Sequence, residues 1–215
     1  ATIFALAFMG ALMVLYQFRR LNKRLRREVA RRHEIEQELR SQAYTDPLTG
    51  TGNRRALMEV GHRSFAMSVR DQEPLSLIMV DVDHFKRIND SWGHDFGDQC
   101  LRHIATCLKD QIKRPRDVAV RFGGEEFALL LPGTDATGAS KLCQDILEAV
   151  RDSRITAPDG TVISLTVSAG IAELGIEEQP EGLFRRADGA LYASKAAGRD
   201  AITLAQRSSE PASNS

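Results

Sequence analysis

The hydrophobic pattern changes twice along the 215 residues of this chain. Residues 1–16 form an uncharged apolar run, and a dense group of basic residues follows it. Residues 21–42 contain no glycine or proline, and their apolar side chains recur at steps of three and four, which indicates a long helix with a weak heptad. From Asp46 onward, short apolar runs alternate with amphipathic stretches. The pattern therefore predicts a long N-terminal helix followed by one folded domain.

Within that domain the pattern predicts both helices and strands. After the turn-rich residues 46–53, Asn53 is a plausible N-cap for a helix that ends near Arg70. The apolar run PLSLIMVDVD, broken only by a serine, is typical of a strand covered on both faces. In DVAVRFGGEEFALLL, two strands are joined by a Gly-Gly turn, which is the signal of a tight hairpin. Further helices are predicted at 84–91, 97–112, 135–152 and 181–197, and further strands at 162–172 and 200–204.

This order of elements predicts an α+β fold in which helices surround a mixed central sheet, in a ferredoxin-like arrangement. We expect the folded domain at residues 45–205 and a disordered tail at 206–215, where small polar residues dominate. The GTG triplet at 50–52 is not a dinucleotide-binding fingerprint, because no strand precedes it and the third glycine is absent.

Charge is distributed unevenly although the formal net charge is zero. Residues 19–32 hold eight basic residues and one acid, so the rest of the chain carries about seven more acidic than basic residues. This balance argues against a surface for a nucleic acid polymer, which needs a basic excess to displace counterions from phosphates. An anionic ligand must instead be bound by a few basic side chains at specific positions or by metal ions.

The N-terminal pattern suggests a membrane anchor. Residues 1–18 are expected to be the inner end of a transmembrane helix, since the run is slightly short and the chain begins with Ala rather than Met. Basic residues after the run place the domain in the cytoplasm. A signal-peptide core and a buried soluble helix are the alternatives. Residues 19–44 are expected to form a basic signalling helix, either a two-stranded coiled coil that joins two copies or a single solvated helix.

The three cysteines, Cys100, Cys107 and Cys143, form no CxxC pair and have no histidine pair at zinc-ligand spacing. They are best interpreted as small apolar side chains in a reducing compartment.

Acidic residues gather at two predicted strand ends. Asp81 and Asp83 close one strand, while Glu125 and Glu126 open another. If these strands pair, the acids meet at one rim of the sheet, where unpaired carboxylates would resist ionisation. Carboxylates without nearby His or Cys favour a hard cation such as Mg²⁺ or Mn²⁺. A single strand-end acid is usually only solvated, so the prediction depends on the whole group.

Polar residues between and after these acids suit a guanine nucleotide. Lys86 and Asn89 share a helix face, and a carboxylate such as Asp98 can accept from both N1–H and the exocyclic amine of guanine. Alone, Asn89 would be a capping residue and Asp98 a helix N-cap. Lys195 and Arg199, four residues apart, offer one positive face for a triphosphate or form a solvated pair.

The motifs DPLTGTGNRR, DVDHFKRINDSWGHDFGD, RFGGEEF and YASKAAGRD occur in this order. With them the chain resembles the GGDEF-domain diguanylate cyclases from about residue 45 to 204. The resemblance implies a nucleotidyl-cyclase-like fold and a face-to-face homodimer, in which two GTP molecules condense to cyclic di-GMP with loss of two pyrophosphates. Together with the expected N-terminal anchor, the resemblance implies a location at the inner membrane of a bacterium, with the catalytic domain in the cytoplasm.

The resemblance implies roles for individual residues. Two metal ions per site would be held by Asp81, Glu125 and the carbonyl of Val82. Glu125 is the first candidate for proton acceptor and Glu126 the second. The nucleotide contacts implied are Asn89 and Asp98 to guanine, Lys86, Lys195 and Arg199 to phosphates, and Gly123 and Gly124 at the turn beside it.

Two further features bear on regulation. In the family, an RxxD motif such as Arg114–Asp117, upstream of the signature, forms an inhibitory site for the product. Arg121 could contribute to that site or form a strand-edge salt bridge. Thr51 departs from the family, which more often has Leu, and we expect an effect on packing or on docking of the preceding helix.

Two other functions remain open. A catalytically silent GGDEF module would bind GTP or cyclic di-GMP as a receptor, although every assigned signature residue is present. An adenylyl-cyclase-like enzyme would share the metal chemistry but would not explain Asp98 opposite a purine edge.

Overall fold

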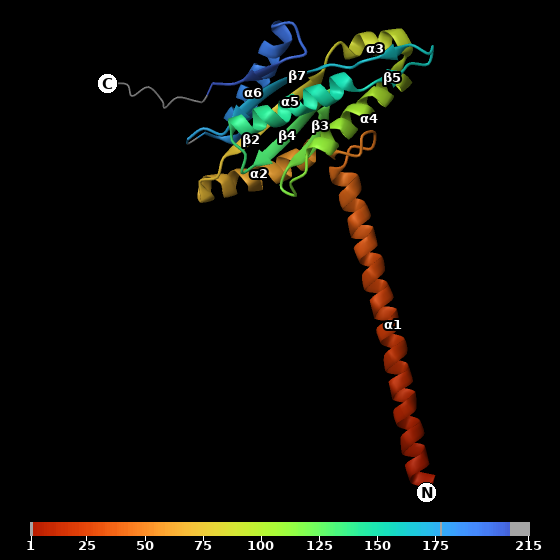
Figure 1. The fold of residues 1–215 in the computed structure, drawn as a ribbon. Helices are drawn as coiled ribbons and strands as arrows, with labels where there is room; N and C mark the ends of the chain where they lie inside the picture. Colours follow the sequence, from red (N-terminus) through yellow and green to blue (C-terminus); the bar gives the residue numbers. More distant parts are fainter. Residues whose placement is uncertain (1, 177, 207–215) are drawn as a thin grey trace, which may run out of the picture. The chain divides into compact units, whose positions relative to one another are not determined.

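The computed structural model describes residues 2–176 and 178–206, and these form two units (Figure 1). The first unit, residues 1–43, holds all of the helix α1 (Thr2–Tyr44) except its last residue, and this confirms that a long helix precedes the sheet. Across the described part of the chain, no helix combines the length and apolarity needed to cross a membrane. The anchor and the coiled coil stay predictions, and the tail predicted at 206–215 lies outside the described residues beyond its first position.

The second unit is built on a mixed sheet, as predicted, and this sheet has six strands. Its order is β1-β3-β4-β2-β7-β8. The central strand β2 pairs antiparallel with β4 and β7, whereas β1 runs parallel to β3 and β8 parallel to β7. The strands are β1 (Gly52–Asn53), β2 (Leu75–Val82), β3 (Val118–Gly123), β4 (Glu126–Pro132), β7 (Val167–Glu173) and β8 (Ile202–Leu204).

Five helices cover this sheet on both faces. They are α2 (Arg54–Asp71), α3 (Phe85–Trp92), α4 (His94–Gln111), α5 (Ala136–Asp152) and α6 (Pro180–Ala196). Along β2, Ile78 and Val80 enter a core shared with α3, α4 and α5. Leu77 and Met79 enter a second core shared with α2 and α6. Because successive strand residues point to opposite faces, both faces of β2 are mostly apolar, with Ser76 and Asp81 as its polar residues, and every one of its residues is buried.

Two predicted boundaries are wrong. The strand expected at 162–172 is divided: β6 (Val162–Ile163) pairs with β5 (Ile155–Thr156) in a separate two-stranded sheet, and only β7 joins the main sheet. The helix expected at 97–112 begins at His94, because only Gly93 adopts a positive φ, of 84°, while Gly97 is buried inside the helix. The capping prediction is confirmed: the side chain of Asn53 accepts from the backbone N–H of Ala56 at 3.0 Å.

The cysteines behave as small apolar residues. All three are free thiols, and Cys100 and Cys143 lie in the core with α4 and α5. Burial raises the pKa of Cys100 to about 11 and that of Cys143 to about 12. These two thiols therefore stay protonated and unreactive near neutral pH.

Candidate active site

Strand pairing brings the predicted acids together at one rim of the sheet. Asp81 near the end of β2 lies directly opposite Glu126, the first residue of β4. The backbone N–H of Val82 donates to the carbonyl of Glu125 at 3.3 Å. Direct partners in an antiparallel pair point to the same face of the sheet, so the side chains of Asp81 and Glu126 share one face.

The hairpin turn lies one residue later than predicted. Gly123 pairs with Glu126, so the two-residue turn is Gly124–Glu125 rather than Gly-Gly. The register shifts between Arg121 and Gly123, and this bulge moves the turn along the chain. Gly124 takes φ +52°, which favours glycine. The side chain of Glu125 is therefore positioned by the turn and not by strand alternation, contrary to the sequence-based expectation.

The turn also leaves open space. A Cβ atom built on Gly123 or on Gly124 would meet no atom within 4 Å, and both residues are exposed. A ligand could therefore approach the backbone here, as the resemblance implied for these two glycines.

The acids at the rim crowd one another. Asp81 is 6% exposed, and Lys195 Nζ lies 2.8 Å from its Oδ2. Burial raises the pKa of Asp81, and the charge of Glu125 adds to this while Lys195 opposes it. Burial likewise raises the pKa of Glu126, helped by Asp81 and by Asp188 of α6. Ionised carboxylates at this rim therefore need a nearby cation.

The rim fits a hard metal ion in its chemistry. Asp81 and Glu125 offer carboxylate oxygens, and Val82, whose N–H donates to the Glu125 carbonyl, adds a backbone carbonyl at the same end of β2. The Lys195 ammonium already stands against Asp81 as a cation. Within residues 2–176 and 178–206, no three His, Cys, Asp or Glu side chains are grouped as a metal site. Any ion would thus have to complete its shell with backbone, water and substrate oxygens.

Asp83, only two residues from Asp81, has a structural position. It is 4% exposed and accepts hydrogen bonds from Thr166 Oγ1 at 2.9 Å and Ser168 Oγ at 2.7 Å. It also accepts from the backbone N–H of Asp200 at 2.9 Å. These bonds tie the end of β2 to β7 and to the turn before β8, as expected for a structural acid.

That turn changes the expectation for Arg199. Helix α6 ends at Ala196, and Arg199 and Asp200 both adopt positive φ, at 69° and 46°. Lys195 and Arg199 therefore do not share a helix face, contrary to the prediction. Lys195 reaches the acidic rim, while the exposed Arg199 belongs to the turn that follows the helix.

Three predicted nucleotide contacts lie on α3 and α4: Asn89 and Asp98 for guanine and Lys86 for the phosphates. Lys86 is exposed on α3, and Asn89 lies one turn further along. Asn89 Oδ1 is buried without a hydrogen-bond partner. A Cβ built on Gly97 would lie 1.9 Å from this oxygen, so only glycine allows the approach. Asp98 is half-buried inside α4 and is not its N-cap, because the helix begins at His94.

The RxxD residues lie at the other end of β3 from the Gly124–Glu125 turn. Arg114 Nη1 donates to Thr134 Oγ1 at 2.9 Å. Asp117 Oδ1 is buried without a partner, and burial raises the pKa of Asp117 although Arg114 and Arg116 oppose the shift. The motif thus forms a group separate from the acidic rim.

Two features near the site carried little sequence signal. Gly97 was predicted to begin a helix, and its packing against Asn89 appears only once α3 and α4 are in contact. Asp188 sits on α6, far along the chain from Glu126, and only helix docking brings it near. The GxxxGD spacing of residues 93–98 is the signal that could have indicated the packing of Gly97, whereas nothing in the sequence indicated the approach of Asp188.

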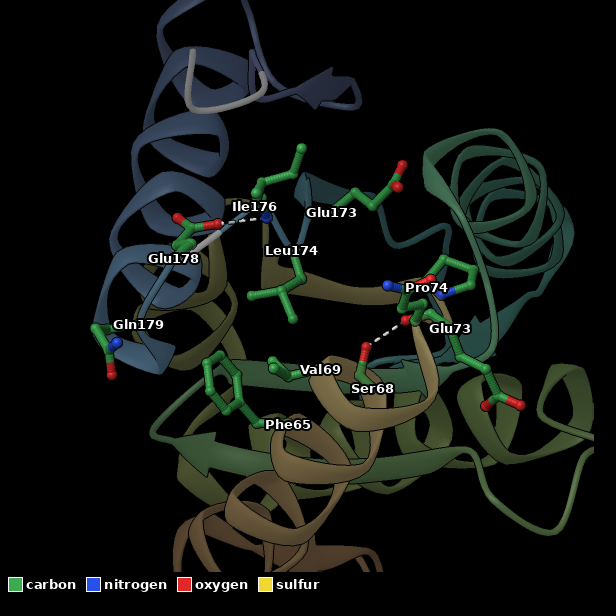
Figure 2. A pocket seen from close by; sticks show the side chains of 12 residues that line it. Phe65, Ser68, Val69, Glu73, Pro74, Glu173, Leu174, Ile176, Glu178 and Gln179 are labelled. Carbon is green, nitrogen blue, oxygen red and sulfur yellow. Dashed lines mark hydrogen bonds between the residues drawn. The ribbon is translucent and has the colours of Figure 1, made fainter. Parts of the chain in front are cut away.

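A large cavity of about 770 Å³ lies elsewhere, and none of the predicted site residues lines it. Figure 2 shows Phe65 and Val69 of α2 facing Leu174 and Ile176 of the loop after β7. The cavity adjoins the start of β2, whereas the acidic rim is at the end of that strand.

Comparison with known proteins identifies relatives of this arrangement. A family model described as "Diguanylate cyclase, GGDEF domain" matches residues 43–201. The chain is 43% identical over 176 residues to diguanylate cyclase DgcP of Pseudomonas aeruginosa, covering 80% of this chain and 26% of that protein. It is 37% identical over 162 residues to response regulator PleD of Caulobacter vibrioides, covering 74% of this chain and 36% of that protein. The chain thus spans about a quarter to a third of these curated relatives.

A solved structure has the same fold. The coiled coil and GGDEF domain of DgcB from Caulobacter crescentus, in complex with c-di-GMP, matches with a TM-score of 0.78 at 34% identity. The match covers 83% of this chain and 94% of that one.

Proposed function

Because this chain belongs to the GGDEF family of diguanylate cyclases, we propose that it condenses two GTP molecules into cyclic di-GMP and two pyrophosphates. The observation that carries the proposal is the pairing of β2 with β4. This pairing places Asp81 next to Glu125 and Glu126, and the Lys195 ammonium lies 2.8 Å from Asp81. The relatives named as diguanylate cyclases and the DgcB complex with c-di-GMP support it.

In this reaction, the 3′-hydroxyl of each ribose attacks the α-phosphorus of the other nucleotide. Asp81, Glu125 and the Val82 carbonyl would hold Mg²⁺ or Mn²⁺, two ions per site. When bound, these ions make the hydroxyl more acidic and neutralise charge on the leaving pyrophosphate. Glu125 is the proposed proton acceptor, because it lies in the turn beside the exposed Gly124, where a ligand could approach. Glu126 is the second choice, since its raised pKa also suits proton transfer.

Substrate recognition is proposed to come from the α3–α4 pair. Asn89 Oδ1 lacks a partner in the described structure, and a donor on guanine would satisfy it. Asp98 would accept from the two adjacent donors of guanine, a pair that adenine does not have. Lys86, Lys195 and Arg199 offer positive charge to the phosphates.

We infer that two copies assemble through α1, because each domain would supply one GTP. On α1, Leu21, Leu25 and Val29 are all more than half exposed and follow one face at steps of four. We further propose that residues 1–18 are the end of a membrane anchor, with the catalytic domain on the cytoplasmic side of a bacterial inner membrane. Fractionation of cells that express the protein tests this: recovery in the cytosol contradicts it.

Product inhibition through Arg114 and Asp117 is also proposed. Asp117 has a buried oxygen without a partner, which a bound ligand could satisfy. Added cyclic di-GMP is expected to slow the wild type and to have less effect on Arg114→Ala. Equal inhibition of both proteins would contradict the assignment.

Incubation with GTP and Mg²⁺ tests the main proposal. Wild-type protein should release pyrophosphate and form cyclic di-GMP, and ATP should not replace GTP. Glu125→Gln should reduce turnover at least about a hundredfold, the scale of a lost general base. Glu148→Gln, a matched change on the exposed face of α5, should not alter turnover. Binding of GTP by the wild type without pyrophosphate release would instead indicate a receptor.

A further inference from the structure

One arginine joins the hairpin turn of the candidate site to the turn that follows α1. Arg121 of β3 donates from Nε to the backbone carbonyl of Gly124 at 2.8 Å. Its Nη1 lies 3.4 Å from each carboxylate oxygen of Asp46, two residues after the end of α1. The side chains of Arg121 and Asp46 are 18% and 16% exposed, so solvent screens this ion pair less than a surface pair.

The carboxylate of Asp46 is itself held in place. Asp46 Oδ1 accepts from the backbone N–H of Thr49 at 2.9 Å and from Thr49 Oγ1 at 2.7 Å. Lys109 of α4 donates to the Thr49 carbonyl at 2.9 Å. Burial alone would raise the pKa of Asp46, but the Thr49 bonds and the Arg121 charge hold it below its usual value. Asp46 therefore stays ionised and oriented toward Arg121.

Thr51 extends this chain of bonds. It is 3% exposed, and its Oγ1 lies 2.8 Å from Thr49 Oγ1. Thr49 has one hydroxyl hydrogen and gives it to the Asp46 carboxylate, so Thr51 must be the donor in the bond between the two hydroxyls. The competing acceptor, the Gly52 carbonyl, is further from Thr51 Oγ1 at 3.2 Å. The leucine that is commoner in the family at this position could not make this bond.

We propose that Thr51 is a positioning residue for the proposed cyclase reaction. Its hydroxyl orients Thr49 and hence Asp46, and Arg121 transmits the constraint to the Gly124 carbonyl. The turn that is held in this way carries Glu125 and is otherwise exposed, so the bond from Arg121 limits its motion. The inference rests on the proposed function for its effect on turnover, but the chain of hydrogen bonds can be tested without nucleotide.

The test compares three variants with the wild type. Thr51→Val keeps the shape and removes the hydroxyl, whereas Thr51→Ser keeps the hydroxyl. Thr106→Val removes an exposed hydroxyl on α4 that bonds only to its own helix, at the Arg102 carbonyl, and serves as a matched control. Two quantities are measured: hydrogen exchange of the Arg121 Nε–H by NMR without nucleotide or metal, and kcat and KM for GTP.

For Thr51→Val we expect Arg121 Nε–H exchange about fivefold faster and kcat about fivefold lower, the scale of one lost hydrogen bond. KM for GTP should change less than about twofold, because the guanine contacts are elsewhere. Thr51→Ser should restore both values, and Thr106→Val should change neither. If Thr51→Val does not fold, Thr51→Ala takes its place with the same expectations.

Wild-type exchange and kcat in Thr51→Val would overturn the inference. So would equal effects of Val and Ser, which would point to packing of the γ-methyl group. Faster exchange with unchanged kcat would retain the bond chain but remove its role in positioning, and this also overturns the proposal. If the wild type itself does not turn over GTP, the proposed function fails, and the exchange rates still decide whether Thr51 orders Arg121.

Discussion

At the scale of single residues, burial favours the neutral form of Asp81, whereas the proposed metal site requires its ionised form. Its side chain is almost fully buried beside Glu125 and Glu126, and this burial raises its pKa above the ordinary value of 3.8. The folded protein therefore keeps this proton to higher pH than the unfolded chain does, so ionisation of Asp81 weakens the fold as pH rises through the two pKa values. A residue retained at such a cost to stability is typical of a functional site.

Asp81→Asn is expected to raise Tm by a few degrees at about pH 7 and to change it less at about pH 3, where the wild-type carboxyl is protonated. Mn²⁺ should raise the Tm of the wild type, since an ion that binds only the folded state stabilises it, and should not raise that of Asp81→Asn. Thermal unfolding with and without Mn²⁺ measures both effects. A variant less stable than the wild type at both pH values contradicts the expectation.

Gly97 is a second residue whose role can be isolated. A Cβ at this position would lie 1.9 Å from Asn89 Oδ1, so Gly97→Ala should displace Asn89 and raise KM for GTP about tenfold while kcat changes little. Gly61→Ala is the control: it lies in α2, where a Cβ meets nothing within 4 Å, and should gain up to about 1 kcal/mol in stability. An unchanged KM in Gly97→Ala would remove Asn89 from the guanine site.

At the scale of elements, the approach of α6 to β7 positions Lys195. A Cβ on Gly170 of β7 would lie 2.1 Å from the Leu191 nitrogen and 2.2 Å from the Ala187 oxygen. These are backbone atoms, which cannot rotate away as a side chain could. Only glycine lets the helix lie this close, and the ion pair between Lys195 and Asp81 depends on that distance.

Gly170→Ala should therefore force α6 away from the sheet and lower the free energy of unfolding by about 3 kcal/mol, as expected for overpacking against backbone. Turnover should fall further than stability explains, because Lys195 withdraws from the rim. Gly189→Ala on the same helix meets no atom within 4 Å and should be tolerated. Denaturant unfolding and GTP turnover measure both variants, and equal stabilities would refute the packing argument.

At the scale of the whole molecule, we expect α1 and the domain to have separate functions. Both apolar cores consist of residues from Tyr44 onward, so residues 44–215 should fold alone with the Tm of the full chain. If α1 joins two copies, specific activity of this fragment should fall on dilution, whereas that of the full chain should stay constant over the same range. Sedimentation and turnover across concentrations measure this. A full chain that is monomeric and still active would exclude assembly through α1.

Sequence patterns predicted elements well where local and tertiary preferences agree. The mainly apolar run of β2 predicted a strand buried on both faces, and its residues pack into two cores. Sequence patterns failed where strand pairing alone defines the element. Residues 52 and 53 form β1 only because they lie beside Val120 and Arg121. The start of α4 was missed because Gly93 and Gly97 are alike in sequence, while packing separates a turn glycine from a helix glycine.

The sequence by itself determined the membership of the family, the apolar positions of both cores and the kinds of group available for chemistry, because motifs and side-chain periodicity are local properties. Only the tertiary structure decided that Asp81 faces Glu126, that Lys195 reaches Asp81 and that Arg121 connects Asp46 with the Gly124–Glu125 turn. These contacts join residues 45 to 114 positions apart along the chain. Strand register and helix docking place such residues, and both depend on how all the elements pack together.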